Sequence, residues 1–229
     1  GGHWENLKNI PGSWTVNYGK LKFNIKQMGF KHTGLFPEQA VNWDFMINKI
    51  KNSNRKIKVL NLFAYTGGAT VACLSAGASV VHVDSSRGMI DWCKENVKSN
   101  GYENAEIRYL VDDVVKFVQR EIRRGNHYDA IIMDPPSYGR GANGEVWNIE
   151  EDLCNLIELC SQILSDDPLF FLINSYTTGL SPTVLSNLLK MTIGKKYTGI
   201  VSCGEVGIPI TNQNLILPCG IYGRWEKDE

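Results

Sequence analysis

Short apolar runs recur along the chain, and the stretches between them have the spacing of amphipathic helices. Five such apolar runs cover residues 58–63, 79–84, 106–111, 127–133 and 169–174. Runs of this length between turn residues are typical of strands buried on both faces of a parallel sheet. The intervening helical patterns, which include 87–99, 114–124 and 150–164, predict crossover connections. The pattern therefore predicts an α/β fold with a mostly parallel sheet.

Two further runs close the chain, over 197–206 and 215–224, after a helix predicted to begin at Ser181-Pro182 and to run to Met191. The connection between these runs is rich in Pro and Asn and is too short for a crossover helix. We therefore expect the last two strands to pair antiparallel, as the end of a seven-stranded sheet.

The first part of the chain has a different pattern. Alternate positions are apolar over 13–18 and 20–26, with Tyr18-Gly19 between them, which predicts a β-hairpin with one apolar face and with lysines on the other. Pro37 then suits the first turn of a helix that ends near residue 52. These patterns predict a short basic β-hairpin extension over 1–36 and a main domain over 37–229.

The turn after the first buried run ends in Gly67-Gly68 and leads into a helix rich in small residues. Glycine lets the backbone turn and lets a ligand approach the main chain, and open α/β sheets bind ligands at this edge. The next run ends in Asp84, at a spacing close to that of an acid that binds ribose hydroxyls. Asp84, Ser85 and Ser86 also compete to cap the following helix, but the pairing of turn and acid favours ribose binding.

Two more acidic positions follow strands. Asp112-Asp113 begins a helix, where acids favour the helix dipole and where one of them could instead bind the amino group of a base. The fourth run leads into Asp134-Pro135-Pro136-Ser137-Tyr138 and then into a Gly-rich loop over 139–144, which is a place to hold a substrate. A strand-end acid can also simply cap such a loop.

The amino-acid composition restricts the class of protein to which the chain can belong. The 43% of hydrophobic residues is ordinary for a globular protein, and no apolar run reaches the roughly 18 to 20 residues that span a bilayer, so we expect a cytoplasmic chain. Six cysteines lack any Cys-x-x-Cys spacing, and four histidines show no paired spacing. We therefore expect reduced thiols, mostly buried, and neither a disulfide nor a metal site.

Charge is uneven along a chain whose net charge is zero. Residues 1–58 hold ten Lys and Arg and three Asp and Glu, a net charge of +7. A basic front part suits a polyanionic partner such as RNA, and equally suits a solvated basic surface.

The predicted order of elements resembles class I S-adenosylmethionine-dependent methyltransferases, which have a Rossmann-like α/β fold. Four segments, residues 60–69, 83–86, 112–114 and 134–138, resemble the bacterial family of 23S ribosomal RNA methyltransferases that modify cytosine C5 or guanine N7. Residues 31–39 also resemble a Lys-Thr-Gly-Phe-Phe-x-Asp-Gln-Arg segment of that family, with His32 inserted, Glu38 for Asp and Ala40 where Arg is usual.

The resemblance implies an enzyme with S-adenosylmethionine as cofactor and ribosomal RNA as substrate. It implies cofactor contacts from each of the motifs: Phe63, Ala64, Tyr65, Thr66 and Gly67 for the methionine part, Asp84 and Ser85 for the ribose, Asp113 and Val114 for the adenine, and Asp134 beside the methyl group. It implies catalytic roles for Asp134, Pro135 and Tyr138, of which Asp134 and Pro135 orient the target base and Tyr138 stacks on it. No metal and no membrane contact are implied, and the oligomeric state stays open.

Two serines restrict which atom of a base the enzyme could methylate. Methylation at cytosine C5 uses a Cys nucleophile in enzymes of this type, either just after the Pro-Pro or just after the fifth strand, where this chain has Ser137 and Ser175. Serine without a base beside it is a poor nucleophile. We therefore expect a base nitrogen, or an oxygen, as the target; the 174–176 segment is more like the guanine-N7 branch.

Other functions are less well supported. A nicotinamide-dependent oxidoreductase should carry Gly-x-Gly-x-x-Gly after the first strand, which residues 65–70 do not supply. A non-catalytic RNA-binding protein should have lost the Asp134-Pro135-Pro136 segment. A methyltransferase of a protein or small molecule stays open, because the extra RNA-binding domain usual in the family is absent from this sequence.

Overall fold

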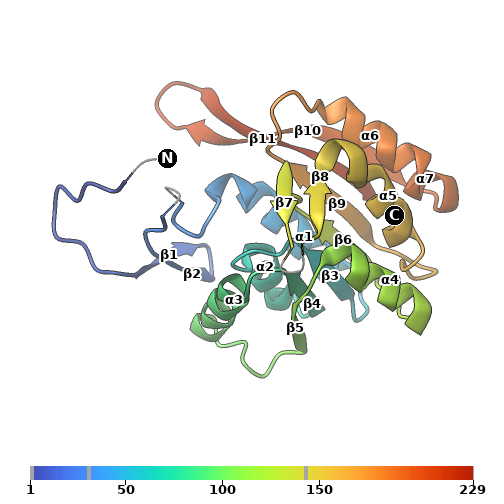
Figure 1. Cartoon of the computed structure of the whole chain (residues 1–229), viewed down its shortest axis with the longest axis horizontal. Coiled ribbons are helices and arrows are strands. Elements are labelled where there is room, and N and C mark those ends of the chain that lie inside the picture. Colours follow the sequence, from blue (N-terminus) through green and yellow to red (C-terminus); the bar gives the residue numbers. More distant parts are fainter. Residues whose placement is uncertain (1–2, 30–31, 142–143, 229) are drawn as a thin grey trace.

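A sheet of seven strands runs through the centre of the molecule (Figure 1). The structure is a computed structural model that describes residues 3–29, 32–141 and 144–228. The strand order is β10-β11-β9-β6-β3-β4-β5. The strands are β3 (Lys58–Leu62), β4 (Ser79–Asp84), β5 (Ile107–Val111), β6 (Ala130–Met133), β9 (Phe170–Ser175), β10 (Ile200–Ile210) and β11 (Leu215–Glu226). The central strands pair parallel, and β11 pairs antiparallel with both β9 and β10. The predicted sheet and its closing antiparallel hairpin are confirmed.

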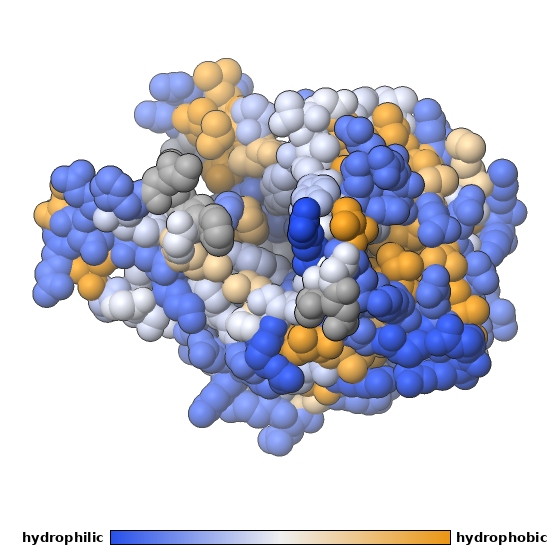
Figure 2. Space-filling view, in the orientation of Figure 1, coloured by the Kyte–Doolittle hydropathy of each residue, from blue (hydrophilic) through white to orange (hydrophobic). Residues whose placement is uncertain are grey.

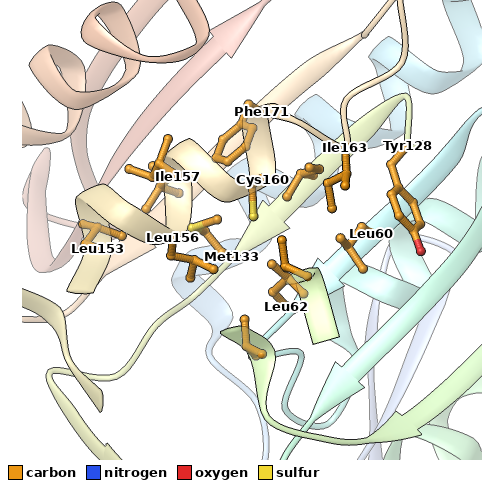
Figure 3. Close-up of a cluster of buried hydrophobic side chains, with 14 of the residues drawn as sticks. Leu60, Leu62, Tyr128, Met133, Leu153, Leu156, Ile157, Cys160, Ile163 and Phe171 are labelled. Atoms are coloured by element: carbon orange, nitrogen blue, oxygen red, sulfur yellow. The ribbon is translucent and has the colours of Figure 1, made fainter. Parts of the chain in front are cut away.

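Helices cover both faces of this sheet. On one face lie η1 (Pro37–Gln39), α1 (Ala40–Asn52), α2 (Gly68–Ser75) and α3 (Arg87–Ser99), and on the other lie α4 (Val114–Arg124), α5 (Ile149–Ser161), α6 (Pro182–Met191) and α7 (Ile193–Lys196). Because side chains alternate along a strand, Val59 enters one core cluster whereas Leu60 and Leu62 enter the other. Figure 3 shows Leu62 and Met133 facing Leu156 and Cys160 of α5.

The predicted N-terminal hairpin is present as β1 (Trp14–Tyr18) and β2 (Leu21–Ile25), which pair antiparallel and pack on the main sheet's helices. Leu21 and Phe23 are buried in the same core cluster as α1, and the Phe23 ring lies 4.9 Å from that of Trp43. The Trp92 indole of α3 donates to the Asn24 carbonyl at 2.8 Å. The division of the chain after residue 36 stays a prediction.

Two local predictions were wrong. The expected Gly-rich loop is a small antiparallel hairpin of β7 (Tyr138–Arg140) and β8 (Val146–Asn148), held because the buried Trp147 donates to the Pro136 carbonyl at 2.7 Å. Residues 142–143 of that segment lie outside the described part. The fourth strand begins at Ala130 instead of 127, because Asp129 turns its carboxylate to the Lys58 N–H, 2.8 Å away.

The end of the β10–β11 hairpin extends beyond the helices (Figure 1). Apolar side chains are exposed there, at the upper left of Figure 2: Leu215, Ile216 and Leu217. Within the described residues, the helices are too short or too polar to cross a membrane.

Candidate active site

The turn after β3 has an unusual backbone. Phe63 and Tyr65 both have φ of 52°, and Gly67 has φ of 86°. Residues other than glycine rarely adopt this left-handed conformation, and where they do it is often at functional sites. The need for glycine was correctly predicted at Gly67, where a Cβ would lie 2.3 Å from the Cys93 sulfur. No sequence pattern predicted that two aromatic residues would share this conformation.

Asp84, at the end of β4, holds this turn. Its two carboxylate oxygens accept hydrogen bonds from the Tyr65 N–H at 2.9 Å and the Ser86 N–H at 2.8 Å. Ser86 caps α3 by accepting from the Met89 N–H, so the cap falls to Ser86 and not to Asp84. Burial raises the pKa of Asp84 above its usual range. Each carboxylate oxygen has more than one lone pair, so Asp84 keeps acceptor capacity for a ligand hydroxyl.

Three adjoining cavities follow the carboxyl ends of β3, β4 and β6, and Phe63 contributes to all three. We call them together the cleft. The first is lined among others by Asn61, Ala64, Thr66 and Asn174. The second is lined by Asp84, Ser85, Asp113, Val114 and Trp147, and the third by Phe36, Tyr65, Asp134, Pro135 and Tyr176. These strand ends therefore bring nearly all of the predicted cofactor-binding residues into one cleft; Gly67 shapes the turn from behind.

The acids at the start of α4 take up their structural roles. Asp113 caps the helix by accepting from the Lys116 N–H at 2.8 Å, and Asp112 forms an ion pair with Arg120. Asp113 and Val114 also line the second cavity, so a ligand in that cavity would meet them both.

Asp134 follows β6 directly and is half-buried between the first and third cavities. Its N–H donates to the Leu62 carbonyl at 3.4 Å. Burial, and secondarily the negative charge of Glu38, raise the pKa of Asp134 to about 7. Pro135 is buried beside it. Tyr138 lies apart: its side chain is exposed on β7, it is not among the lining residues of the cleft, and its hydroxyl accepts from Arg140 at 3.3 Å.

A buried polar network beneath Asp134 was missed by the sequence-based site prediction. The Gln39 amide donates to the Tyr176 hydroxyl at 2.6 Å, and the Asn42 amide donates to Gln39 and to Asn174, both at 2.9 Å. A signal for it existed, because Gln39 and Tyr176 both lie in segments that resemble the methyltransferase family.

The donors and acceptors of the cleft suit a cofactor with a ribose, and the turn after β3 offers no cationic side chain to a phosphate. Of the described residues that line the first cavity, none is Lys or Arg, so the turn offers amide, hydroxyl and main-chain groups instead of a phosphate site. A carboxylate at Asp84 and another at Asp113 can accept from ribose hydroxyls and an adenine amino group. Within residues 3–29, 32–141 and 144–228, His, Cys, Asp and Glu form no cluster that could hold a metal ion. All six cysteines are free, and three of them are buried, fewer than we expected.

The fold and this cleft together define a methyltransferase. A SAM-dependent methyltransferase from Agrobacterium tumefaciens superposes with a TM-score of 0.91 at 36% identity, covering 97% of this chain and 72% of that one. A second structure of this fold, from Streptococcus mutans, has a TM-score of 0.77 at 21% identity, covering 95% of this chain and 56% of that one.

The model of the S-adenosylmethionine-dependent methyltransferase family matches residues 4–179, and the chain belongs to this family. Its relatives include ribosomal RNA large subunit methyltransferase K/L of Shewanella frigidimarina, 33% identical over 66% of this chain, and that of Syntrophotalea carbinolica, 31% identical over 76%. Ribosomal RNA large subunit methyltransferase K of Neisseria meningitidis is 29% identical over 75% of the chain. The chain spans 20%, 24% and 48% of the length of these three relatives.

Proposed function

We propose that the protein transfers a methyl group from S-adenosylmethionine to a base nitrogen of ribosomal RNA. The observation that carries the proposal is the placement of Asp134, which lines both the first and the third cavity, with Pro135 beside it in the lining of the third. An acceptor pair at that place suits a base that presents N–H groups. The names of the relatives, which are ribosomal RNA methyltransferases, support the choice of RNA.

The chain's own part in the reaction is to bind and align. Bound in the cleft, S-adenosylmethionine would supply a methyl group already activated by the positive charge of its sulfur. Asp84 would accept the ribose hydroxyls, with Ser85 beside it, and Asp113 and Val114 would contact the adenine. Asp134 and the Pro135 carbonyl would orient the target nitrogen toward the methyl group. Alignment of this kind can lower a barrier by about 7 to 11 kcal/mol at best, and it needs little acid–base chemistry.

The absence of a suitable thiol in the cleft supports a nitrogen target over cytosine C5. Among the described residues that line the three cavities there is no cysteine. Cys93 packs behind Gly67, and burial raises its pKa well above its usual range. Ser137 occupies one position of the C5 nucleophile and bonds Thr177 at 2.7 Å, and Ser175 occupies the other and is buried.

Some of the positive charges in the first 58 residues support RNA binding, and others are paired within the fold. Several are neutralised within the fold: Lys49 pairs with Glu226 at 2.7 Å, and Arg55 pairs with Asp129 at 2.8 Å. On the hairpin, Lys20, Lys22 and Lys26 form no ion pair with any described residue, and Lys26 lies over the Trp92 ring. The segment after this hairpin contacts the cleft, because Thr66 donates to the Gly34 carbonyl at 2.6 Å. A nucleic-acid backbone on the hairpin would thus lie on the side of the cleft that this segment forms.

The test is a comparison of modified nucleosides in large-subunit ribosomal RNA from cells with and without the gene. Mass spectrometry of the digested RNA should show one methylated base lost in the deletion strain. The gene should restore it, and a gene encoding Asp134→Asn should not. If ribosomal RNA from the two strains has the same methylated nucleosides, the proposed substrate is wrong, and labelling of protein or small-molecule fractions becomes the next experiment.

A further inference from the structure

Aromatic side chains form one wall of the third cavity. The Phe36 ring lies between those of Tyr65 and Tyr176, with 5.5 Å between centroids on each side, and His32 lies 5.6 Å from Phe36. All four residues line the cavity, as do Asp134, Pro135 and Pro136, which belong to the segment after β6. Asp84 and Ser85 line it too, on the side shared with the second cavity. Flat apolar rings and hydrogen-bond acceptors thus share one space.

The Tyr176 ring is fixed in position before any substrate arrives. Its hydroxyl accepts from Gln39, whose own amide oxygen accepts from Asn42, and both of these amide side chains are buried. The ring also packs against β11 at Gly220, where a Cβ would lie 2.8 Å from the Tyr176 ring carbon Cδ1. A ring fixed in this way loses little conformational entropy when a ligand stacks on it.

The lining of the third cavity indicates the shape and charge of its ligand. Among its described lining residues there is no Lys or Arg, so the part of a substrate that enters is not a phosphate. Aromatic rings favour a flat partner, because every nucleobase has a π-face on which such a ring can stack. Acceptors such as the Asp134 carboxylate favour a partner with N–H groups. A nucleobase turned out of its strand has these properties.

We propose that Phe36 and Tyr176, and not Tyr138, hold the target base by stacking. This assignment rests on the proposed function, because it takes the substrate to be RNA. Tyr138 is the residue that family resemblance would select, but it is exposed on β7 and outside the lining of the cavity. Tyr176 instead directly follows β9, which pairs with β6, the strand that Asp134 directly follows, so the Tyr176 ring and the Asp134 carboxylate can meet the same base.

The experiment measures methyl transfer to ribosomal RNA purified from cells that lack the gene, together with the binding of S-adenosylhomocysteine by calorimetry. For Tyr176→Ala we expect kcat/KM for RNA to fall by about ten- to one-hundredfold, the range that loss of one base–aromatic stack gives. The dissociation constant for S-adenosylhomocysteine should change by less than about threefold. Tyr176→Phe keeps the ring and should recover most of the lost activity.

Two further variants keep the test decisive. Phe36→Leu keeps apolar volume and removes the flat ring, so it should reduce kcat/KM in the same direction even if Tyr176→Ala does not fold. Tyr138→Ala should lose less activity than Tyr176→Ala. The assignment is overturned if Tyr176→Ala and Phe36→Leu methylate RNA like the unmodified protein, or if Tyr138→Ala loses more. If the unmodified protein labels no ribosomal RNA while it binds S-adenosylhomocysteine, the proposed function fails and this assignment fails with it.

Discussion

Asp84 and Asp134 are carboxylates of one cleft with different surroundings. Asp84 accepts hydrogen bonds from two main-chain N–H groups. These bonds favour the ionised form and lower its pKa, which offsets part of the increase that burial causes. For Asp134, burial and the nearby negative charge of Glu38 both raise the pKa. Asp84 is therefore suited to hold a cofactor, and Asp134 to a role in which its protonation matters near neutral pH.

The pH dependence of methyl transfer follows from Asp134. In the proposed reaction its ionised form would accept hydrogen bonds from the target base, and its pKa is about 7 in the fold, so kcat/KM should rise as pH increases through about 7 and level off above it. Glu38→Gln removes a negative charge and lowers the pKa of Asp134, so the midpoint should move to lower pH. A profile between about pH 5 and pH 9 measures both effects. A midpoint that Glu38→Gln moves upward, or leaves in place, would contradict this role of Glu38.

At the scale of elements, strands and helices could be predicted largely from periodicity. The runs over 79–84 and 87–99 correspond to β4 and α3 because buried strands and amphipathic helices have distinct patterns. The small hairpin of β7 and β8 could not be predicted, since three-residue strands have no detectable alternation and are held by tertiary contacts of Trp147. The left-handed conformations of Phe63 and Tyr65 could not be predicted either, since the turn that contains them is held by a hydrogen bond from the Tyr65 N–H to Asp84 of another strand.

The N-terminal hairpin is an element whose contribution to stability can be measured. Phe23 is 1% exposed and packs against Trp43, so Phe23→Ala should lower the free energy of unfolding by about 3 to 5 kcal/mol. Urea denaturation followed by far-ultraviolet circular dichroism measures this. Lys20→Ala, at the exposed turn of the same hairpin, is the matched control and should change the value by less than about 0.5 kcal/mol. A loss of less than about 1 kcal/mol for Phe23→Ala would mean that the hairpin is not part of the cooperative core.

At the scale of the whole molecule, residues distant in sequence form the cleft because strands β3, β4, β6 and β9 end at one edge of the sheet. Predicting which acids lie there required only the order of strands, so Asp84, Asp113 and Asp134 could be selected from the sequence. Family-like segments pointed to Gln39, but the contacts of the N-terminal segment could not be predicted, because Asn42 and Asn174 meet across more than 130 positions of the chain. Their contacts depend on how η1 and α1 pack on the end of β9.

The central claim is that this cleft binds S-adenosylmethionine through Asp84 and uses Asp134 for transfer. Calorimetric titration of S-adenosylhomocysteine into the unmodified protein, Asp84→Ala and Asp134→Asn tests it most directly, with thermal unfolding of each variant as the check on folding. We predict one binding site in the unmodified protein, a similar affinity in Asp134→Asn, and a loss of at least about a hundredfold in Asp84→Ala, since that carboxylate holds the turn and, in the proposed complex, would accept from the ribose. Equal affinity in a folded Asp84→Ala variant, or equal loss in both variants, would contradict the account.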